Sequence, residues 1–136
     1  MSRARAVTVR LTALVLVAAA TAWALSTYTA VYVGGDSMSP ALVRGDLAVV
    51  RRSIAGAKVG DILLVTKAGW PGGVLHRVIA VTFDGRFQLR GDANPVPDLD
   101  PVPASAVRGT VALLVPTGRV MAVIDALARM VQSRLT

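Results

Sequence analysis

The sequence has 136 residues and a formal net charge of +7, which fits one compact domain and a basic protein near an anionic membrane surface. It contains no cysteine and one histidine, which excludes a disulfide framework, a cysteine nucleophile and a metal site built from thiolates or from histidines alone. Aromatic residues make up only 4% of the chain and most basic residues are scattered, so we expect no nucleic-acid partner.

The first predicted element is a membrane-spanning helix that occupies, with its basic tip, residues 1–32. No charged residue lies between Leu11 and Gly35, and about 20 mostly apolar residues are enough to cross a bilayer. Three arginines precede this run: Arg3, Arg5 and Arg10. By the positive-inside rule they keep the N-terminus in the cytoplasm. We therefore expect a single-pass protein of the cell membrane whose remaining chain lies on the extracytoplasmic face.

A cleaved signal peptide is the alternative for the same segment. The tripeptide Ala22-Trp23-Ala24 has the small-x-small form of a cleavage site. The uncharged run is longer than the apolar region of a signal peptide, which usually has about 7–15 residues. The length of the run therefore favours an anchor.

Residues 33–118 are predicted to form a β-rich domain. Short runs rich in Val, Ile and Leu alternate with Gly, Pro and Asp, as in strands separated by turns. The predicted strands are Leu47–Arg52, Ile62–Lys67, Val74–Thr82, Arg86–Arg90 and Val107–Val115. Two turns are predicted between them: Gly69–Gly73, with Trp70 exposed at its tip, and the two-residue hairpin turn Asp84-Gly85.

The segment Asp92–Pro103 contains four prolines, so it is predicted to be a loop without regular structure. Three aspartates in it, ending at Asp100, raise the alternative of a calcium site. The spacing lacks the glycine and the terminal glutamate of an EF-hand loop. We therefore expect neither a metal nor a cofactor.

Residues 119–136 are predicted to form an amphipathic helix. Apolar residues recur on one face at helical spacing: Val120, Ile124, Leu127, Val131 and Leu135. Charged residues interrupt the segment and argue against a second membrane span: Asp125, Arg129 and Arg134. The helix could pack on the sheet or lie in the membrane interface. The predicted fold class is thus mainly β, with a transmembrane helix, a small sheet or barrel-like domain and a short C-terminal helix.

The residue that could carry chemistry is Ser37, which follows two glycines just after the apolar run. A serine in such a turn is ordinarily only a turn residue, and it needs a base to act as a nucleophile at neutral pH. The only histidine is His76, on a predicted strand where it could equally be structural. A histidine base needs a group that fixes its tautomer, and the proline-rich loop offers Asp92 and Asp98.

Four short motifs, in this order, resemble those of type I signal peptidases. The nucleophile motif is matched by Ser37-Met38-Ser39-Pro40, and a Gly-Asp motif at the start of a strand by Gly60-Asp61-Ile62. The base motif is matched by His76-Arg77-Val78, and a second Gly-Asp motif by Gly91-Asp92-Ala93-Asn94. The resemblance spans residues 11–115.

The resemblance implies roles for these residues. Ser37 would be the nucleophile and His76 the general base, in place of the lysine of most bacterial members, as in the archaeal, endoplasmic-reticulum and spore-former type. Asp98 matches the second aspartate of that type and would orient His76, while Asp92 would hold the loop or support the site. The choice between the two aspartates stays open, because Pro95 and Pro97 make the loop depart from the family pattern.

The implied activity is that of signal peptidase I, a serine endopeptidase. Its substrates would be secreted preproteins, cut at small-x-small sites at the outer membrane surface, and its partners the lipid bilayer and the secretion machinery. An extended substrate would pair with a strand edge, and the candidate contacts are Gly35, Asp36, Met38 and Pro40. Lysine-type members often have a hydroxyl residue as second oxyanion donor where this chain has Gly35, so that donor stays unassigned.

Two other functions compete with this interpretation. A self-cleaving repressor-type peptidase uses a serine and a lysine; the apolar segment argues against it, and Lys58 and Lys67 lack the Arg-Val context of the base motif. A catalytically inactive membrane-anchored β domain could bind secretion partners. The presence of Ser37, His76 and two aspartates in matching motifs argues against inactivity.

Overall fold

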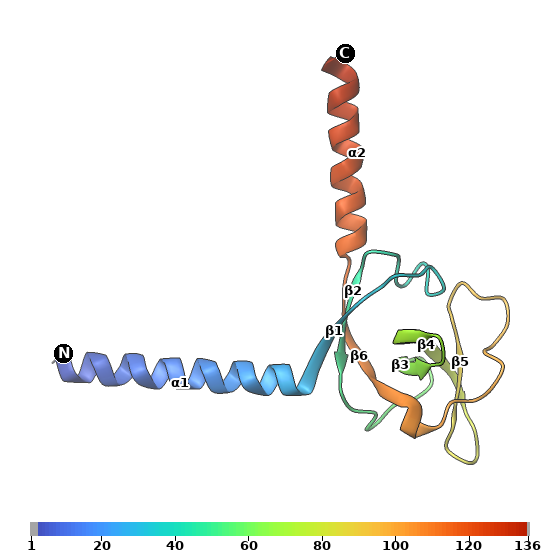
Figure 1. Cartoon of the computed structure of the whole chain (residues 1–136), viewed down its shortest axis with the longest axis horizontal. Coiled ribbons are helices and arrows are strands. Elements are labelled where there is room, and N and C mark those ends of the chain that lie inside the picture. The colour runs from blue at the N-terminus through green and yellow to red at the C-terminus, as the bar shows by residue number, and fades with distance from the viewer. Residues whose placement is uncertain (1–2, 136) are drawn as a thin grey trace.

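The computed structural model describes residues 3–135, and it confirms a mainly β fold with a long apolar helix at the N-terminus and a shorter helix at the C-terminus (Figure 1). The elements in chain order are α1 (Arg3–Thr27), β1 (Tyr28–Tyr32), β2 (Leu47–Arg51), β3 (Ile62–Lys67), β4 (Trp70–Val81), β5 (Phe87–Arg90), the short 3-10 helix η1 (Ala104–Ala106), β6 (Val107–Val115) and α2 (Thr117–Leu135).

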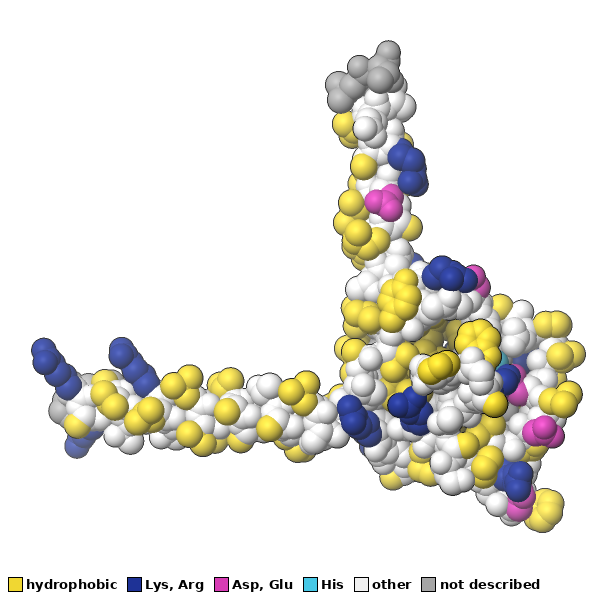
Figure 2. All heavy atoms as spheres, in the orientation of Figure 1, with side chains coloured by type: hydrophobic (Ala, Val, Ile, Leu, Met, Phe, Trp, Pro, Cys, Tyr) yellow, Lys and Arg dark blue, Asp and Glu magenta, His cyan; other side chains and the backbone are white. Residues whose placement is uncertain are grey.

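Helix α1 has 25 residues and a mean hydropathy of 1.8 in its most apolar stretch, so it is long and apolar enough to span a membrane. Hydrophobic side chains cover its length, and basic side chains gather near its N-terminal end (Figure 2). The prediction that the helix reaches Tyr32 is wrong, because α1 ends at Thr27. Residues Tyr28–Tyr32, rich in aromatic and β-branched residues that suit strands, form β1 and pair with β2.

The six strands form one antiparallel sheet in the order β1-β2-β6-β3-β4-β5. Strands β1 and β5 are its two edges, so among the described residues the sheet is not closed into a barrel. Strand β6 is the last in the sequence and lies between β2 and β3. It therefore joins the half of the sheet that follows α1 to the half that contains His76.

The core consists of two clusters, one on each face of the sheet. Neighbouring residues of a strand point to opposite faces, and on β3 both Leu63 and Leu64 are buried, in different clusters. The first cluster also contains Met38 and Leu42, which come from the segment between β1 and β2. These two side chains are 2% and 0% exposed, so the core anchors the chain on the C-terminal side of Ser37.

Two predicted turns differ from the structure. Strand β4 begins at Trp70, so Gly69–Gly73 is not a turn as predicted; only the first of these residues, Gly69, lies in the turn that joins β3 to β4. A bulge between Val65 and Lys67 lets the strand continue through Pro71, which would interrupt a regular ladder. The hairpin between β4 and β5 has three loop residues rather than two, because Thr82 and Arg86 close it by hydrogen bonds, with Gly85 at a φ of +77°.

The C-terminal helix forms, but one of its two predicted placements is wrong. Helix α2 projects away from the sheet (Figure 1) instead of packing on it. From Arg119 to Ser133 every side chain is exposed. The side chains of Arg134 and Leu135, which the prediction also used, lie outside the described ones.

We predict that Gly109 on β6 tolerates no side chain. A Cβ at this position would lie 2.2 Å from the carbonyl oxygen of Arg51, a backbone atom of the neighbouring strand. Gly109→Ala should lower the free energy of unfolding by about 1–3 kcal/mol through overpacking. Gly72→Ala is the control, since nothing lies within 4 Å of its Cβ. Urea unfolding in detergent, followed by tryptophan fluorescence, measures both; equal effects would contradict the packing argument.

Candidate active site

Ser37 lies in a tight turn between β1 and β2. The Ser39 amide donates to the Asp36 carbonyl at 3.0 Å, and the Leu42 amide donates to the Met38 carbonyl at 2.9 Å. Met38 and Leu42 are buried in the core, whereas Ser37 is half-buried. The turn therefore fixes the backbone and leaves the Ser37 hydroxyl partly accessible.

His76 lies on β4, opposite Leu63 of β3, and is only 5% exposed. Its Nε2 atom is 3.3 Å from the Ser37 hydroxyl oxygen, and its Nδ1 atom is 2.7 Å from a carboxylate oxygen of Asp98. A carboxylate can only accept a hydrogen bond, so Nδ1 carries the proton and donates to Asp98. Nε2 of the neutral ring is then an acceptor for the serine hydroxyl.

Asp98 reaches His76 from the loop that follows β5. Its amide donates to the Leu89 carbonyl at 2.8 Å, and its carbonyl accepts a hydrogen bond of 2.7 Å from the Gln88 side chain. Both backbone groups of Asp98 are thus tied to β5. This anchoring holds the carboxylate against the imidazole although prolines precede it.

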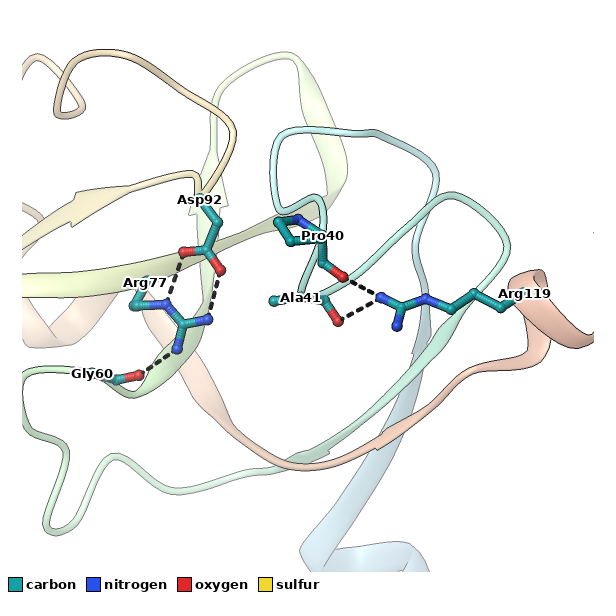
Figure 3. A network of polar contacts seen from close by, with 6 residues as sticks. All are labelled: Pro40, Ala41, Gly60, Arg77, Asp92 and Arg119. Carbon is teal, nitrogen blue, oxygen red and sulfur yellow. Dashed lines mark hydrogen bonds and ion pairs between the residues drawn. The ribbon is translucent and has the colours of Figure 1, made fainter.

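Asp92 contacts Arg77 and not His76 (Figure 3). The Arg77 guanidinium donates to both carboxylate oxygens, at 2.8 and 2.6 Å, and also to the Gly60 carbonyl at 2.7 Å. Hydrogen bonding to Asp92 raises the pKa of Arg77, because it favours the charged form more than partial burial disfavours it. Asp92 therefore ties its loop to β4 and to the turn before β3.

Gly91 lets this loop approach the serine closely. A Cβ on Gly91 would lie 2.6 Å from the Ser37 carbonyl oxygen. That oxygen accepts a hydrogen bond of 2.8 Å from the Ala93 amide. The loop thus supports the Ser37 backbone directly, which explains the glycine in the motif.

Arg119, in the first turn of α2, makes contacts that the sequence did not suggest. Its guanidinium donates to the carbonyls of Pro40 and Ala41 (Figure 3) and lies 3.8 Å from the buried carboxylate of Asp46. Pro40, predicted as a substrate contact, thus has its carbonyl engaged by α2. The contact joins residues that are 79 apart in the sequence, and no local motif marks it.

A groove of about 560 Å³ opens beside the serine. One side consists of residues 31–38 and the other mainly of residues 69–76, with Asn94 and Lys67 also in its lining. Of the predicted substrate contacts, Gly35 and Asp36 are exposed in this lining, whereas the side chain of Met38 is buried. Among the described residues, no group of three or more His, Asp or Glu side chains could hold a metal ion.

One family model matches the chain. It is described as Peptidase S24-like and matches residues 14–109, a range that runs from α1 into β6. The matched range includes Ser37, His76 and Asp98. No curated protein matches the chain at a significant level.

We predict that the Arg77–Asp92 pair stabilises the fold. Asp92→Asn removes a charge from a doubly hydrogen-bonded pair whose side chains are 33% and 19% exposed, and should lower the free energy of unfolding by about 1–2 kcal/mol. Asp84→Asn is the control, because its ion pair with Arg86 is about half exposed on both sides and is screened by solvent, so its loss should have the smaller effect. Thermal unfolding in detergent measures both variants. A loss for Asp92→Asn no larger than the control's would show that the pair is not structural.

Proposed function

This chain belongs to the Peptidase S24-like family, which makes it a hydrolase of the serine protease kind, and we propose that it is a membrane-anchored signal peptidase. The observation that carries the proposal is the hydrogen-bonded series Ser37–His76–Asp98, which lies beside a groove in a β domain directly after an apolar helix. Its substrates would be secreted preproteins with small-x-small cleavage sites.

The proposed chemistry begins at the Ser37 hydroxyl. As its oxygen attacks the scissile carbonyl, Nε2 of His76 takes the proton, and Asp98 stabilises the imidazolium through Nδ1–H. His76 then gives the proton to the leaving amine, and water releases the acyl group from Ser37 by the reverse sequence. The distance of 3.3 Å between Ser37 and His76 suits a site without substrate, since such contacts tighten on binding.

The oxyanion would be bound by the Ser37 backbone amide. Within the described part of the chain no hydrogen bond uses this amide, so it is available for the developing charge. Gly35 has no side chain to act as a second donor. Asn94 lines the same groove and is the candidate for that role.

The groove supports an extended substrate. Its walls are residues 31–38, which continue from the edge strand β1, and the first half of β4. A strand-like peptide between them would pair with backbone groups and place alternate side chains into the groove. With α1 in the cell membrane and the N-terminus in the cytoplasm, the β domain would lie on the extracytoplasmic face, where signal peptides present their cleavage sites.

A repressor-type self-cleaving peptidase is the second candidate, because such peptidases and signal peptidases share the fold superfamily of the matched model. Lys67 lines the groove and is the residue that a serine–lysine mechanism would use. Among the described residues no hydrogen bond links Lys67 to Ser37, whereas His76 makes one. The hydrogen bond favours the histidine mechanism.

The proposal predicts that cleavage of a preprotein depends on Ser37. Purified full-length protein in detergent should convert a preprotein with a small-x-small site to its mature form, identified by mass spectrometry of the new N-terminus. Ser37→Ala should lower the rate by at least about 1,000-fold, because the covalent route is lost. Cleavage of its own chain alone would favour the self-cleaving candidate. No cleavage of several preproteins would favour an inactive binding domain.

The base is identified by a pair of variants. His76→Ala should lower kcat by about 100- to 10,000-fold. Lys67→Ala should change it by less than about threefold, because the lysine is exposed and, within the described residues, makes no hydrogen bond to Ser37 or His76. Steady-state cleavage of a preprotein peptide measures both, with circular dichroism as a check of folding. The opposite result, a dead Lys67 variant and an active His76 variant, would establish a serine–lysine mechanism.

A further inference from the structure

We propose that helix α2 is a second membrane contact, which lies along the surface of the bilayer that α1 crosses and binds it through one apolar face. The proposal rests on the anchoring role of α1. It assigns a lipid surface as the partner of a helix whose first turn holds it to the β domain by hydrogen bonds and whose side chains from Arg119 to Ser133 are exposed.

The apolar face consists of side chains that are each at least half exposed: Val120, Met121, Val123, Ile124, Leu127, Met130 and Val131. Their spacing of three and four residues places them on one side of a helix with 3.6 residues per turn. The opposite side contains the small or polar residues Ala122, Asp125, Arg129 and Ser133. Such a helix fits the boundary between lipid and water.

The length and the charges of α2 favour the surface over a second span. The helix has 19 residues, fewer than the 25 of α1, and Asp125 and Arg129 lie in its middle. Each would have to enter the centre of the bilayer in a spanning helix, which costs about 2.5–3.5 kcal/mol per charge. On the surface, both remain in water.

The β domain fixes the direction in which α2 leaves. The Thr117 hydroxyl donates to the Gly45 carbonyl at 2.7 Å, and the Gly118 amide donates to the buried Asp46 carboxylate at 3.1 Å. A Cβ on Gly118 would lie 2.4 Å from the Arg44 carbonyl oxygen, so this contact is close. With Arg119 bound to the carbonyls of Pro40 and Ala41, three successive residues of the first turn are tied to the segment between β1 and β2.

This direction suits a helix that lies on the membrane of α1. In Figure 1, α2 leaves the β domain across the direction of α1 and not alongside it. Figure 2 shows hydrophobic side chains mainly along the edge of α2 that faces the side of α1, with charged side chains toward the other edge. If α1 crosses the bilayer, α2 therefore lies along its surface with the apolar face toward the lipid.

Single-cysteine labelling tests this placement, because the chain has no cysteine of its own. The full-length protein would be reconstituted into phosphatidylcholine vesicles with a minority of phosphatidylglycerol, with an NBD dye on Leu127→Cys or, as the matched control on the opposite side, on Ala122→Cys. We expect the dye at position 127 to be quenched by lipids spin-labelled near the headgroup. Dithionite in the outer buffer should reduce it about tenfold more slowly than the dye at position 122.

A third label, on Leu16→Cys in α1, separates this proposal from its premise. Protection at position 16 with equal, fast reduction at positions 122 and 127 would overturn the α2 contact alone. An unprotected position 16 would overturn the anchor and the α2 contact together. Quenching of both α2 labels by spin labels deep in the acyl chains would indicate a second span. Protection at position 127 without lipid quenching would indicate a protein partner, such as a second copy of the chain. Either result would overturn the proposal.

Discussion

The structure of the site depends on the burial of one imidazole. His76 is 5% exposed. A buried polar group without a hydrogen-bond partner would lower the free energy of unfolding by about 1–3 kcal/mol. Its two ring nitrogens point along different directions, so two separate segments must supply the partners. The Ser37 turn satisfies one nitrogen and the Asp98 loop the other. The pairing of both ring nitrogens therefore also brings the serine, the histidine and the carboxylate together.

Charged contacts around this centre hold the two partner segments in place. Neighbouring residues of β4 point to opposite faces, so Arg77 extends away from the serine and binds the start of the loop that contains Asp98. The same loop supports the Ser37 carbonyl through Ala93. Arg119 holds the other end of the Ser37 turn from α2. The site therefore has carboxylates of different function, one against the imidazole and one against a guanidinium.

Sequence motifs predicted much of this arrangement, and their limits have physical causes. Ser37, His76 and Asp92 were singled out because each lies in a short local motif, and Asp98 because it follows the last of these motifs. The motifs did not decide which aspartate meets His76, since that depends on the path of a loop with four prolines and on its anchoring to β5. Helix α1 ends at Thr27 because the residues that follow pair with β2, and no local pattern shows this pairing. The role of Arg119 depends on a contact with residues distant in the sequence, which no local pattern shows either.

The place of β6 in the sheet has a consequence for the newborn chain. Ser37 leaves the ribosome first, His76 follows 39 residues later, and Asp98 another 22 residues after that. Strand β6 comes later still, and it alone joins the half-sheet of Ser37 to the half-sheet of His76. At about 5–20 residues per second, several seconds separate the synthesis of Ser37 from that of His76. The Ser37–His76 hydrogen bond therefore forms only late in synthesis, when β6 is available to join the two half-sheets.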